Sequence, residues 1–374
     1  MLQKIKESCT ECGACRKYCA FLSRYGTPKR IADHLDFSLS HHPSIAHECS
    51  LCGLCSAICP EDLDPASLFL GIRRRFVEDG HFDNTPYRAI LGYEKRGVSP
   101  LFSWYGLPEG CDTVFFPGCT LPGTRPAVTI KLYRELKQTI PALGFVLDCC
   151  TKPSNDLGRT DPFHAVFGEM HQYLIEHGIR TVLTACPNCT KIFRLYGHGL
   201  AVRTVYEILH DIANAIPAHF TGTALTIHDP CALRADLNTH SAIRGLLAKR
   251  GYTVTEMKHR GKNTLCCGEG GMVSAVNPEL AQAWASTRCR EAGGHKIVTY
   301  CAGCADNLNR VVPTVHIADL LYHPEAVLNG NPRVARAPLT YLNRLLLKRR
   351  MNREVNPAVQ RMRPLKVGKV LRAF

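Results

Sequence analysis

Cysteine offers the most chemistry in this sequence, because it accounts for 20 of the 374 residues. Two stretches near the start repeat the spacing CxxCxxCxxxC. The first consists of Cys9, Cys12, Cys15 and Cys19, and the second of Cys49, Cys52, Cys55 and Cys59. Three cysteines at this spacing bind one corner of a four-iron cubane, and the fourth reaches the neighbouring cluster. The doubled spacing therefore predicts two [4Fe–4S] cubane clusters that relay electrons.

A crossed arrangement gives each predicted cubane four ligands. One cluster takes Cys9, Cys12, Cys15 and Cys59, and the other takes Cys49, Cys52, Cys55 and Cys19. The alternative is a pair of zinc knuckles, but zinc needs only four ligands and commonly takes them from two CxxC pairs. Eight cysteines in a doubled ferredoxin spacing favour iron–sulfur clusters over zinc.

Ten further cysteines form two sets of five, each with one cysteine, then an adjacent pair, then CxxC. The first set is Cys119, Cys149, Cys150, Cys186 and Cys189, and the second is Cys231, Cys266, Cys267, Cys301 and Cys304. Five thiolates exceed the need of one tetrahedral zinc or one four-ligand cubane. Adjacent cysteines point in different directions, which suits a larger cluster gripped at two of its irons. The alternatives are four ligands with one spectator, or a zinc site in one copy.

A few polar residues and thiols lie outside these sets. Cys111 and Cys289 are interpreted as ordinary buried or surface thiols. His228 and Asp229 precede Cys231, where they either shuttle protons or orient the end of the strand, and we favour orientation. The sequence suggests no Ser–His–Asp or Cys–His nucleophile pair.

The elements that must position these thiols follow a repeat. From Cys111 onward, β-branched runs and amphipathic helices alternate twice, at a period near 115 residues. This alternation predicts two small α/β units with mostly parallel sheets. Each cysteine group follows a predicted strand, and ligands gather at the carboxyl edge of such sheets, so we expect the groups to converge. Residues 81–110 are rich in Gly, Pro and Tyr and are interpreted as a linker.

The doubled five-cysteine pattern, with CCGEGG in the second copy, resembles the CCG-domain iron–sulfur oxidoreductases. Members with two such copies after a twin-cubane domain include the catalytic subunit of heterodisulfide reductase and the iron–sulfur subunits of glycolate oxidase and anaerobic glycerol-3-phosphate dehydrogenase. The resemblance implies a noncubane [4Fe–4S] cluster in one or both copies, the two sites facing each other across a substrate disulfide. The cysteines of both sets would then line the active site. The first copy departs from the motif, because Thr151 replaces the glycine after the cysteine pair.

Together these features predict a multidomain chain of the α+β and α/β classes. Residues 1–80 form a mainly helical ferredoxin-type domain, 111–220 and 221–325 form two tandem CCG domains, and 326–374 form a basic helical tail. Gly268, Gly270 and Gly271 are expected to clear side chains from the cluster face that a substrate approaches.

The charge of the chain is concentrated in its tail. Of the net charge of +14, residues 331–374 contribute +11, which argues against a nucleic-acid-binding fold. Leu339, Leu342, Leu345 and Leu346 recur at helical spacing among arginines. This helix is expected to lie on an anionic membrane surface, to dock on a partner such as a membrane cytochrome, or to remain a solvated tail.

The start of the chain has no secretory signal and no stretch is apolar enough to cross a membrane, so clustered thiols in a reducing cytoplasm are expected. As a variant, the basic tail suggests that this protein, expected to be cytoplasmic, attaches to the inner face of the cell membrane. The preferred function is reduction of a small disulfide with electrons from a flavoprotein or other donor subunit. The alternative is an electron-transfer subunit of a flavin-dependent 2-hydroxyacid or glycerol-3-phosphate dehydrogenase that feeds quinone. A zinc-dependent binding module is the third, non-redox interpretation.

Overall fold

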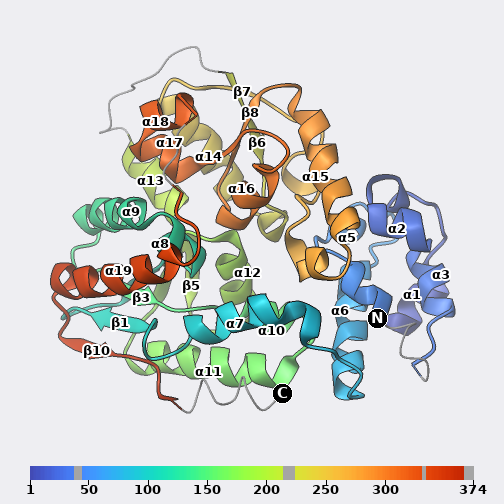
Figure 1. Ribbon diagram of the computed structural model, residues 1–374, viewed down its shortest axis with the longest axis horizontal. Helices are drawn as coiled ribbons and strands as arrows, with labels where there is room; N and C mark the ends of the chain where they lie inside the picture. Colours follow the sequence, from blue (N-terminus) through green and yellow to red (C-terminus); the bar gives the residue numbers. More distant parts are fainter. Residues whose placement is uncertain (38–43, 214–223, 331–333, 366–374) are drawn as a thin grey trace.

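A computed structural model describes residues 1–37, 44–213, 224–330 and 334–365 of the chain. Figure 1 shows its three parts: a helical domain at the N-terminus (blue), an α/β domain with a six-stranded sheet, and an α/β domain with a four-stranded sheet. The mixed α/β class and the order of these parts confirm the predicted fold class. The end of the predicted basic tail, 366–374, lies outside the described residues.

The N-terminal domain consists of short helices that frame the cysteine loops. These are α1 (Leu2–Ser8), α2 (Ala20–Tyr25), α3 (Pro28–Asp33), α5 (Leu54–Ala57) and α6 (Pro65–Glu78), with the 3-10 turns η1 (Arg16–Tyr18) and η2 (Ile45–Glu48). Helices α3 and α6 begin at side-chain caps, since Thr27 accepts the backbone N–H of Arg30 and Asp64 accepts that of Ser67. Proline follows each cap, in the first helical position, where its missing N–H costs nothing.

The first α/β domain is built on the strand order β10-β1-β3-β2-β4-β5. Its strands are β1 (Trp104–Leu107), β2 (Thr113–Phe116), β3 (Gly144–Leu147), β4 (Thr181–Thr184), β5 (Ala201–Thr204) and β10 (Val359–Arg361). Strands β3, β2, β4 and β5 are parallel, whereas β1 runs antiparallel to both β3 and β10. The helices are α8 (Thr120–Thr124), α9 (Pro126–Thr139), α10 (Lys152–Asp156), α11 (Thr160–Glu176), α12 (Pro187–Tyr196) and α13 (Val205–Ile212).

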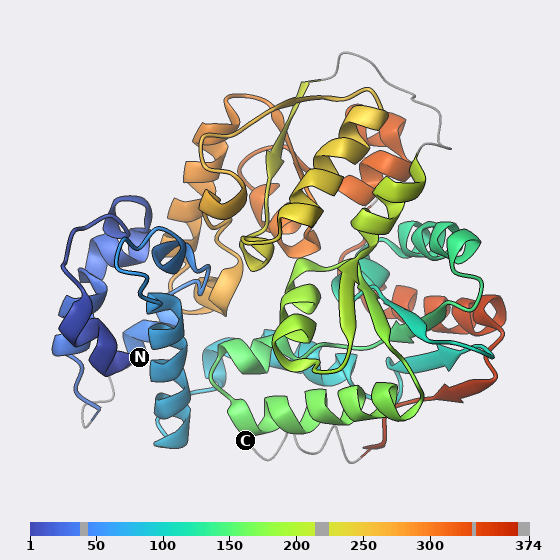
Figure 2. The ribbon, with the colours of Figure 1, turned by 180° about the vertical axis from the view of Figure 1, so that it is seen from behind.

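Alternate residues of this sheet bury opposite faces. Phe115 and Phe145 belong to a core with α9 and α13, while Phe116 and Val146 pack with α11 and α12. Figure 2 shows α11 as the long green helix that runs beneath the strands. Helices therefore cover both faces, as a parallel sheet requires.

The second α/β domain repeats the plan with an all-parallel sheet in the order β7-β6-β8-β9. Its strands are β6 (Ala224–His228), β7 (Thr253–Thr255), β8 (Lys296–Thr299) and β9 (Thr314–His316). Its helices are α14 (Leu237–Lys249), α15 (Pro278–Ala292), α16 (Ala302–Leu308), α17 (Ile317–Tyr322) and α18 (Pro324–Leu328), with turns η5 (Cys231–Leu233), η6 (Gly261–Asn263) and η7 (Gly270–Ala275). One continuous apolar core joins this domain to the first.

The segment interpreted as a linker, 81–110, is folded into the first α/β domain. After the turn η3 (Thr85–Tyr87) it forms helix α7 (Arg88–Gly97) and strand β1, whose Trp104 and Tyr105 are buried. The interpretation fails because Gly and Tyr here are packed residues: a Cβ on Gly97 would lie 3.1 Å from the Cβ of Cys149. Tertiary contact overrides the loop-like composition.

The described part of the basic tail is not a solvated extension. Helix α19 (Leu339–Val355) lies against α8 and α9, and β10 pairs with β1 and forms the edge of the sheet. The buried stripe of α19 consists of Leu347, Met351 and Val355, which join the shared core. The leucines singled out by their helical spacing in the sequence differ from this stripe, since Leu339, Leu342 and Leu346 are exposed. Among the described residues, no helix is long and apolar enough to cross a membrane.

Candidate metal centres

The first group of thiols surrounds a hollow in the N-terminal domain. Cys9, Cys12, Cys15 and Cys59 all line it, and Cys55 lies at its side. Burial, followed by the neighbouring Cys9 thiol, raises the pKa of Cys15 to about 11. The chain thus brings together the four cysteines that the crossed assignment gives to one cubane.

A second group gathers next to it. Burial raises the pKa of Cys19 above its usual range, and the Cys52 and Cys49 thiolates raise it further. Burial also raises the pKa of Cys55, with contributions from Cys49, Cys52, Cys19 and Cys15. Cys55 and Cys15 are therefore neighbours, and they bring the two predicted cubane sites side by side.

The first five-cysteine set occupies the carboxyl edge of the first sheet, as the sequence predicts. Cys119 follows β2 and caps α8, the pair Cys149–Cys150 follows β3, and Cys186 follows β4 and caps α12. The Sγ atoms of Cys150 and Cys189 lie 3.5 Å apart. A hydrogen bond from the Cys149 thiol lowers the pKa of Cys119 to about 6.

The second set converges in the same way but by a different route. Cys231 follows β6, and Cys301 follows β8 and caps α16. The Sγ atoms of Cys267 and Cys304 lie 3.2 Å apart. The predicted strand before Cys266 is absent, because β7 ends at Thr255 and a loop containing η6 leads to the cysteine pair.

Asp229 holds that loop in place of a strand. Its carboxylate accepts the backbone N–H of Gly261 at 2.7 Å and two N–H groups of Arg244 at 3.0 and 3.1 Å. Its backbone carbonyl accepts the Thr264 hydroxyl at 2.8 Å. These bonds tie Asp229 to loop structure and leave no free carboxylate for moving protons.

His228 has a different environment, directly at the thiols. It is fully buried, both ring nitrogens lack a hydrogen-bond partner among the described residues, and burial lowers its pKa to about 3. One ring nitrogen and the Sγ atoms of Cys267 and Cys304 lie within 4.8 Å of one another. A neutral imidazole is therefore aimed at the second set.

The donor chemistry of all four groups fits iron–sulfur clusters. Four or five thiols face one another at each group. Burial raises the pKa of Cys55, and hydrogen bonds with neighbouring thiols, followed by burial, raise the pKa of Cys231 and of Cys304. Buried thiolates need a nearby positive charge, and metal ions supply it while deprotonating the thiols they bind. The unpartnered His228 nitrogens likewise leave donors or acceptors for a bound group.

Thr151 adopts the conformation that glycine has in the second copy. Its φ is 53°, in the left-handed region, while Gly268 has a φ of 95°. For a β-branched residue this region costs about 1–2 kcal/mol. Thr151 is fully buried and its hydroxyl lacks a partner among the described residues, but the turn still brings Cys149 and Cys150 to their set.

The glycines of CCGEGG mainly admit neighbouring backbone instead of clearing a cluster face as the sequence led us to expect, although Gly270 also lines a recess beside the thiols of the second set. A Cβ on Gly271 would lie 2.5 Å from the carbonyl oxygen of Cys49, and one on Gly270 would lie 2.6 Å from that of Ser50. A Cβ on Gly268 would collide with the carbonyl of Ala281. The missing side chains let backbones approach closely, and two of these backbones belong to the N-terminal domain.

Two arginines that the cysteine spacing could not reveal hold the three parts together. Arg73, in α6, is fully buried and donates to the carbonyls of Ala46, Asp156 and Gly271 at 2.7 to 3.1 Å, and also to that of Cys49. Its acceptors come from all three domains. Arg234 donates from Nε and Nη2 to the carbonyl of Cys52, each at 3.1 Å.

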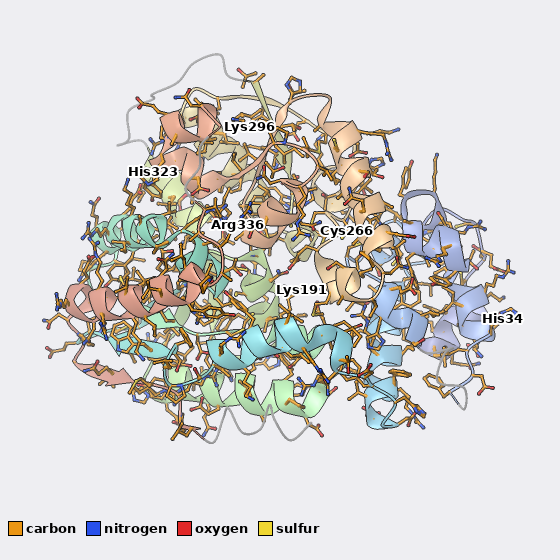
Figure 3. The ribbon with its side chains drawn as sticks, viewed as in Figure 1. His34, Lys191, Cys266, Lys296, His323 and Arg336 are labelled. Carbon is orange, nitrogen blue, oxygen red and sulfur yellow. The ribbon has the colours of Figure 1, made fainter. Side chains whose placement is uncertain are left out.

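A recess lies at this junction, where all three domains contribute to the wall. Figure 3 shows Lys191 and Cys266 in the middle of the molecule, where the three parts meet. The recess is lined by four cysteines of the second set, by Glu269, by Ser50 and Leu51 of the N-terminal domain, and by Lys152, Asn188 and Lys191 of the first α/β domain. Lys152 forms an ion pair with Asp156.

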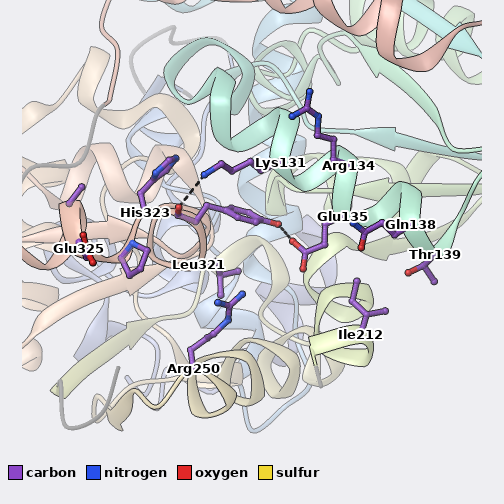
Figure 4. A pocket seen from close by; sticks show the side chains of 13 residues that line it. Lys131, Arg134, Glu135, Gln138, Thr139, Ile212, Arg250, Leu321, His323 and Glu325 are labelled. Atoms are coloured by element: carbon purple, nitrogen blue, oxygen red, sulfur yellow. Dashed lines mark hydrogen bonds between the residues drawn. The ribbon is translucent and has the colours of Figure 1, made fainter. Parts of the chain in front are cut away.

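A separate groove of about 980 Å³ lies far from the chemistry, between α9 and the α17–α18 corner (Figure 4). There Lys131 donates to the carbonyl of Tyr322 at 3.3 Å, and the Tyr322 hydroxyl donates to Glu135. No cysteine lines this groove, so it takes no part in the site.

Comparisons with known proteins agree with the geometry. Residues 8–64 match the family described as a 4Fe-4S dicluster domain, and residues 113–194 and 225–309 each match the cysteine-rich domain family CCG. One subunit of the dihydromethanophenazine:CoB–CoM heterodisulfide reductase from Methanosarcina barkeri is 24% identical over 364 residues, covering 81% of this chain and 88% of that protein. The Methanosarcina mazei protein of the same name is 25% identical with the same coverage.

A third relative is longer than this chain. It is one subunit of the fumarate reductase (CoM/CoB) from Methanothermobacter marburgensis, 27% identical over 278 residues, covering 68% of this chain but only 55% of that protein. The chain thus spans about half the length of this relative. The family matches and the arrangement of the thiols lead to one conclusion: the chain belongs to the iron–sulfur oxidoreductase family that joins a 4Fe-4S dicluster domain to two CCG domains, and it is related to subunits of heterodisulfide reductase.

Proposed function

We propose that this chain is the subunit of a disulfide reductase complex in which a small disulfide, two electrons and two protons yield two thiols. The observation that carries the proposal is the recess at the three-domain junction. There Cys231, Cys267, Cys301 and Cys304 face the side chains of Lys152, Asn188 and Lys191. The recess, of about 20 Å³, marks where the second set faces the first CCG domain; no cysteine of the first set lines it, so a disulfide would approach the second set there.

Iron–sulfur clusters, when bound, would supply one-electron transfer. Cys9, Cys12, Cys15 and Cys59 would hold one cubane, and Cys49, Cys52, Cys55 and Cys19 the other. The two five-cysteine sets would hold noncubane [4Fe–4S] clusters. Electrons would enter through the N-terminal domain from a partner, either a flavoprotein or another one-electron donor subunit.

The order of the sites follows from their contacts. A hydrogen bond with Cys231 lowers the pKa of Cys266, but a hydrogen bond with Cys267, burial and the nearby Cys52 thiolate raise it. Cys49, Cys55 and Cys266 also belong to one apolar cluster. The second set would therefore receive electrons from the N-terminal domain before the first set does. Arg73 and Arg234 fix this approach through the carbonyls of Cys49 and Cys52.

The residues of the recess would bind and orient the disulfide. Lys191 and Asn188 lie on α12, one turn from Cys186, and offer N–H donors to polar groups of the substrate. Burial in this recess strengthens such bonds, because less water competes for the donors. The side chains of Ser50 and Leu51 close the recess on the N-terminal side.

The test is an anaerobic preparation analysed for iron and sulfide and then assayed with reduced viologen and a panel of low-molecular-weight disulfides. Four four-iron clusters predict about sixteen irons per chain. Cys304→Ser should lower both iron content and turnover. Cys289→Ser is the matched control, since Cys289 lies outside both sets, and it should change neither. A fully loaded protein that reduces no disulfide in the panel would refute the proposal.

One observation favours a second candidate, an electron-transfer subunit whose substrate lies on a partner. The relative from the fumarate reductase carries a different named activity. A flavin-dependent dehydrogenase of a hydroxyacid or of glycerol phosphate would be such a partner. Co-purification with a flavoprotein, and activity only in that complex, would distinguish this candidate from the first.

A further inference from the structure

Arg344 is a buried arginine that the basic tail carries to the first five-cysteine set. It lies on α19 and is 1% exposed. Asn343 donates to the carbonyl of Gly123 at 2.8 Å, and a Cβ on Gly123 would lie 3.1 Å from the carbonyl oxygen of Thr340. Helix α19 therefore lies directly on α8, the helix that Cys119 caps. This contact places the middle of α19 beside the thiols.

The guanidinium of Arg344 is only partly satisfied by the protein. Its Nη2 donates weakly to the carbonyls of Gly97 and Phe102, at 3.4 and 3.5 Å, and the Phe102 ring centroid lies 5.6 Å from its central carbon. Nε and Nη1 lack a hydrogen-bond partner among the described residues. Across the residues that the structure describes, Arg344 forms no ion pair with a carboxylate. A buried charge without a partner is strongly unfavourable, so Nε and Nη1 of Arg344 are available to donate to a negatively charged group.

The free side of the guanidinium faces the first set. A Cβ on Gly97 would lie 3.5 Å from Nη1 of Arg344 and 3.1 Å from the Cβ of Cys149, so both flank the same glycine. Arg363, the other fully buried arginine of the tail, is instead neutralised by ion pairs with Asp148 and Glu169.

We propose that Arg344 donates N–H hydrogen bonds from Nε and Nη1 to the iron–sulfur cluster of the first five-cysteine set, and that its charge raises the reduction potential of that cluster. The inference rests on the proposed function only in requiring a cluster at this site. Hydrogen bonds and positive charge near the sulfurs favour the reduced form, which carries one more negative charge. Arg344 would thus touch the cluster itself, and the described tail acts on the interior of its own chain.

The experiment is an EPR-monitored redox titration of the loaded full-length protein. The signal of the first set is assigned with Cys150→Ser, which should remove it. Arg344→Met and Arg344→Gln should shift its midpoint to more negative values, by at least a tenfold change in the ratio of oxidised to reduced cluster, or about 59 mV. Arg344→Lys should restore part of the shift, because it keeps the charge but loses the forked donors.

Lys348→Met is the matched control, since Lys348 lies one turn further along α19 and bonds the carbonyls of Pro100 and Leu101. In Lys348→Met, the midpoint potential of the cluster of the first set should equal that of the wild type. The cluster-free Arg344→Met protein should melt no lower than the cluster-free wild type, because it loses an unpaired buried charge. A fully iron-loaded Arg344→Met whose midpoint matches Lys348→Met would overturn the inference. A wild type without iron at the first set would instead contradict the proposed function.

Discussion

Arg73→Met is the substitution expected to separate the three domains while leaving every cysteine in place. Arg73 donates two hydrogen bonds to carbonyls of its own domain, those of Ala46 and Cys49, and one each to Asp156 and Gly271 of the two CCG domains. Methionine fills much of the same volume but leaves all four carbonyls without this donor. The lost hydrogen bonds therefore lie where the domains meet.

The size of the effect follows from these bonds. A hydrogen bond contributes about 1 kcal/mol net, and an acceptor left buried without a donor costs about 1–3 kcal/mol. Part of this is offset because a fully buried guanidinium no longer has to be desolvated. We expect a net loss of about 3–5 kcal/mol in the free energy of unfolding. For a chain of this length unfolding as one unit, that lowers the melting temperature by about 5 °C.

The assay combines thermal unfolding with rapid reduction. Arg73→Met should keep its iron but show slower reduction of the second five-cysteine set when electrons enter through the N-terminal domain. Arg75→Met is the control, because Arg75 lies on the same helix, is exposed and forms an i,i+4 ion pair with Asp79. It should lie within about 0.5 kcal/mol of the wild type. Equal melting temperatures for the two variants would refute the role given to Arg73.

Three further predictions test separate parts of the site. Gly271→Ala should destabilise the chain, since φ is +62° and the Cβ would lie 2.5 Å from a carbonyl of the N-terminal domain. Gly293→Ala, at φ +58° with open space around it, is the control for backbone strain alone. Equal losses of stability for the two variants in calorimetry would contradict the importance of the contact between Gly271 and the N-terminal domain. Burial raises the pKa of Glu94 to about 7, so the folded state holds a proton that the unfolded state releases, and stability should fall by about 3 kcal/mol as pH rises from 4.5 to 7. Glu94→Gln should flatten that slope in denaturant titrations, and an unchanged slope would rule the carboxyl out. His228→Leu should leave the cluster-free protein at least as stable as the cluster-free wild type, because two unpartnered ring nitrogens disappear. In the iron-loaded protein it should lower both stability and iron retention. Equal effects on the two forms would show that the imidazole does not face the cluster.

Much of the fold was readable from periodicity. The alternation of β-branched runs and amphipathic helices predicted two α/β units, and the structure has the same strand-to-helix corner in both, at β5–α13 and β9–α17. The interpretation of 81–110 as a linker was wrong because composition does not report packing. The solvated-tail interpretation failed for the described part of α19 for the same reason: Leu347, Met351 and Val355 are buried by another domain.

By itself, the sequence determined which thiols form sets, because ligand spacing is a local property of the backbone. Local spacing could not decide what surrounds each set. The glycines of CCGEGG, interpreted as an open face, admit the loop of Cys49 and Ser50, which is distant in the sequence. Arg73, His228 and Arg344 became visible only in the tertiary structure, since the burial and unmet hydrogen bonds of a side chain depend on neighbours from other domains. Thus local sequence spacing determines which cysteines can bind a cluster together. The charges and contacts around each set of cysteines arise only when the three domains pack together.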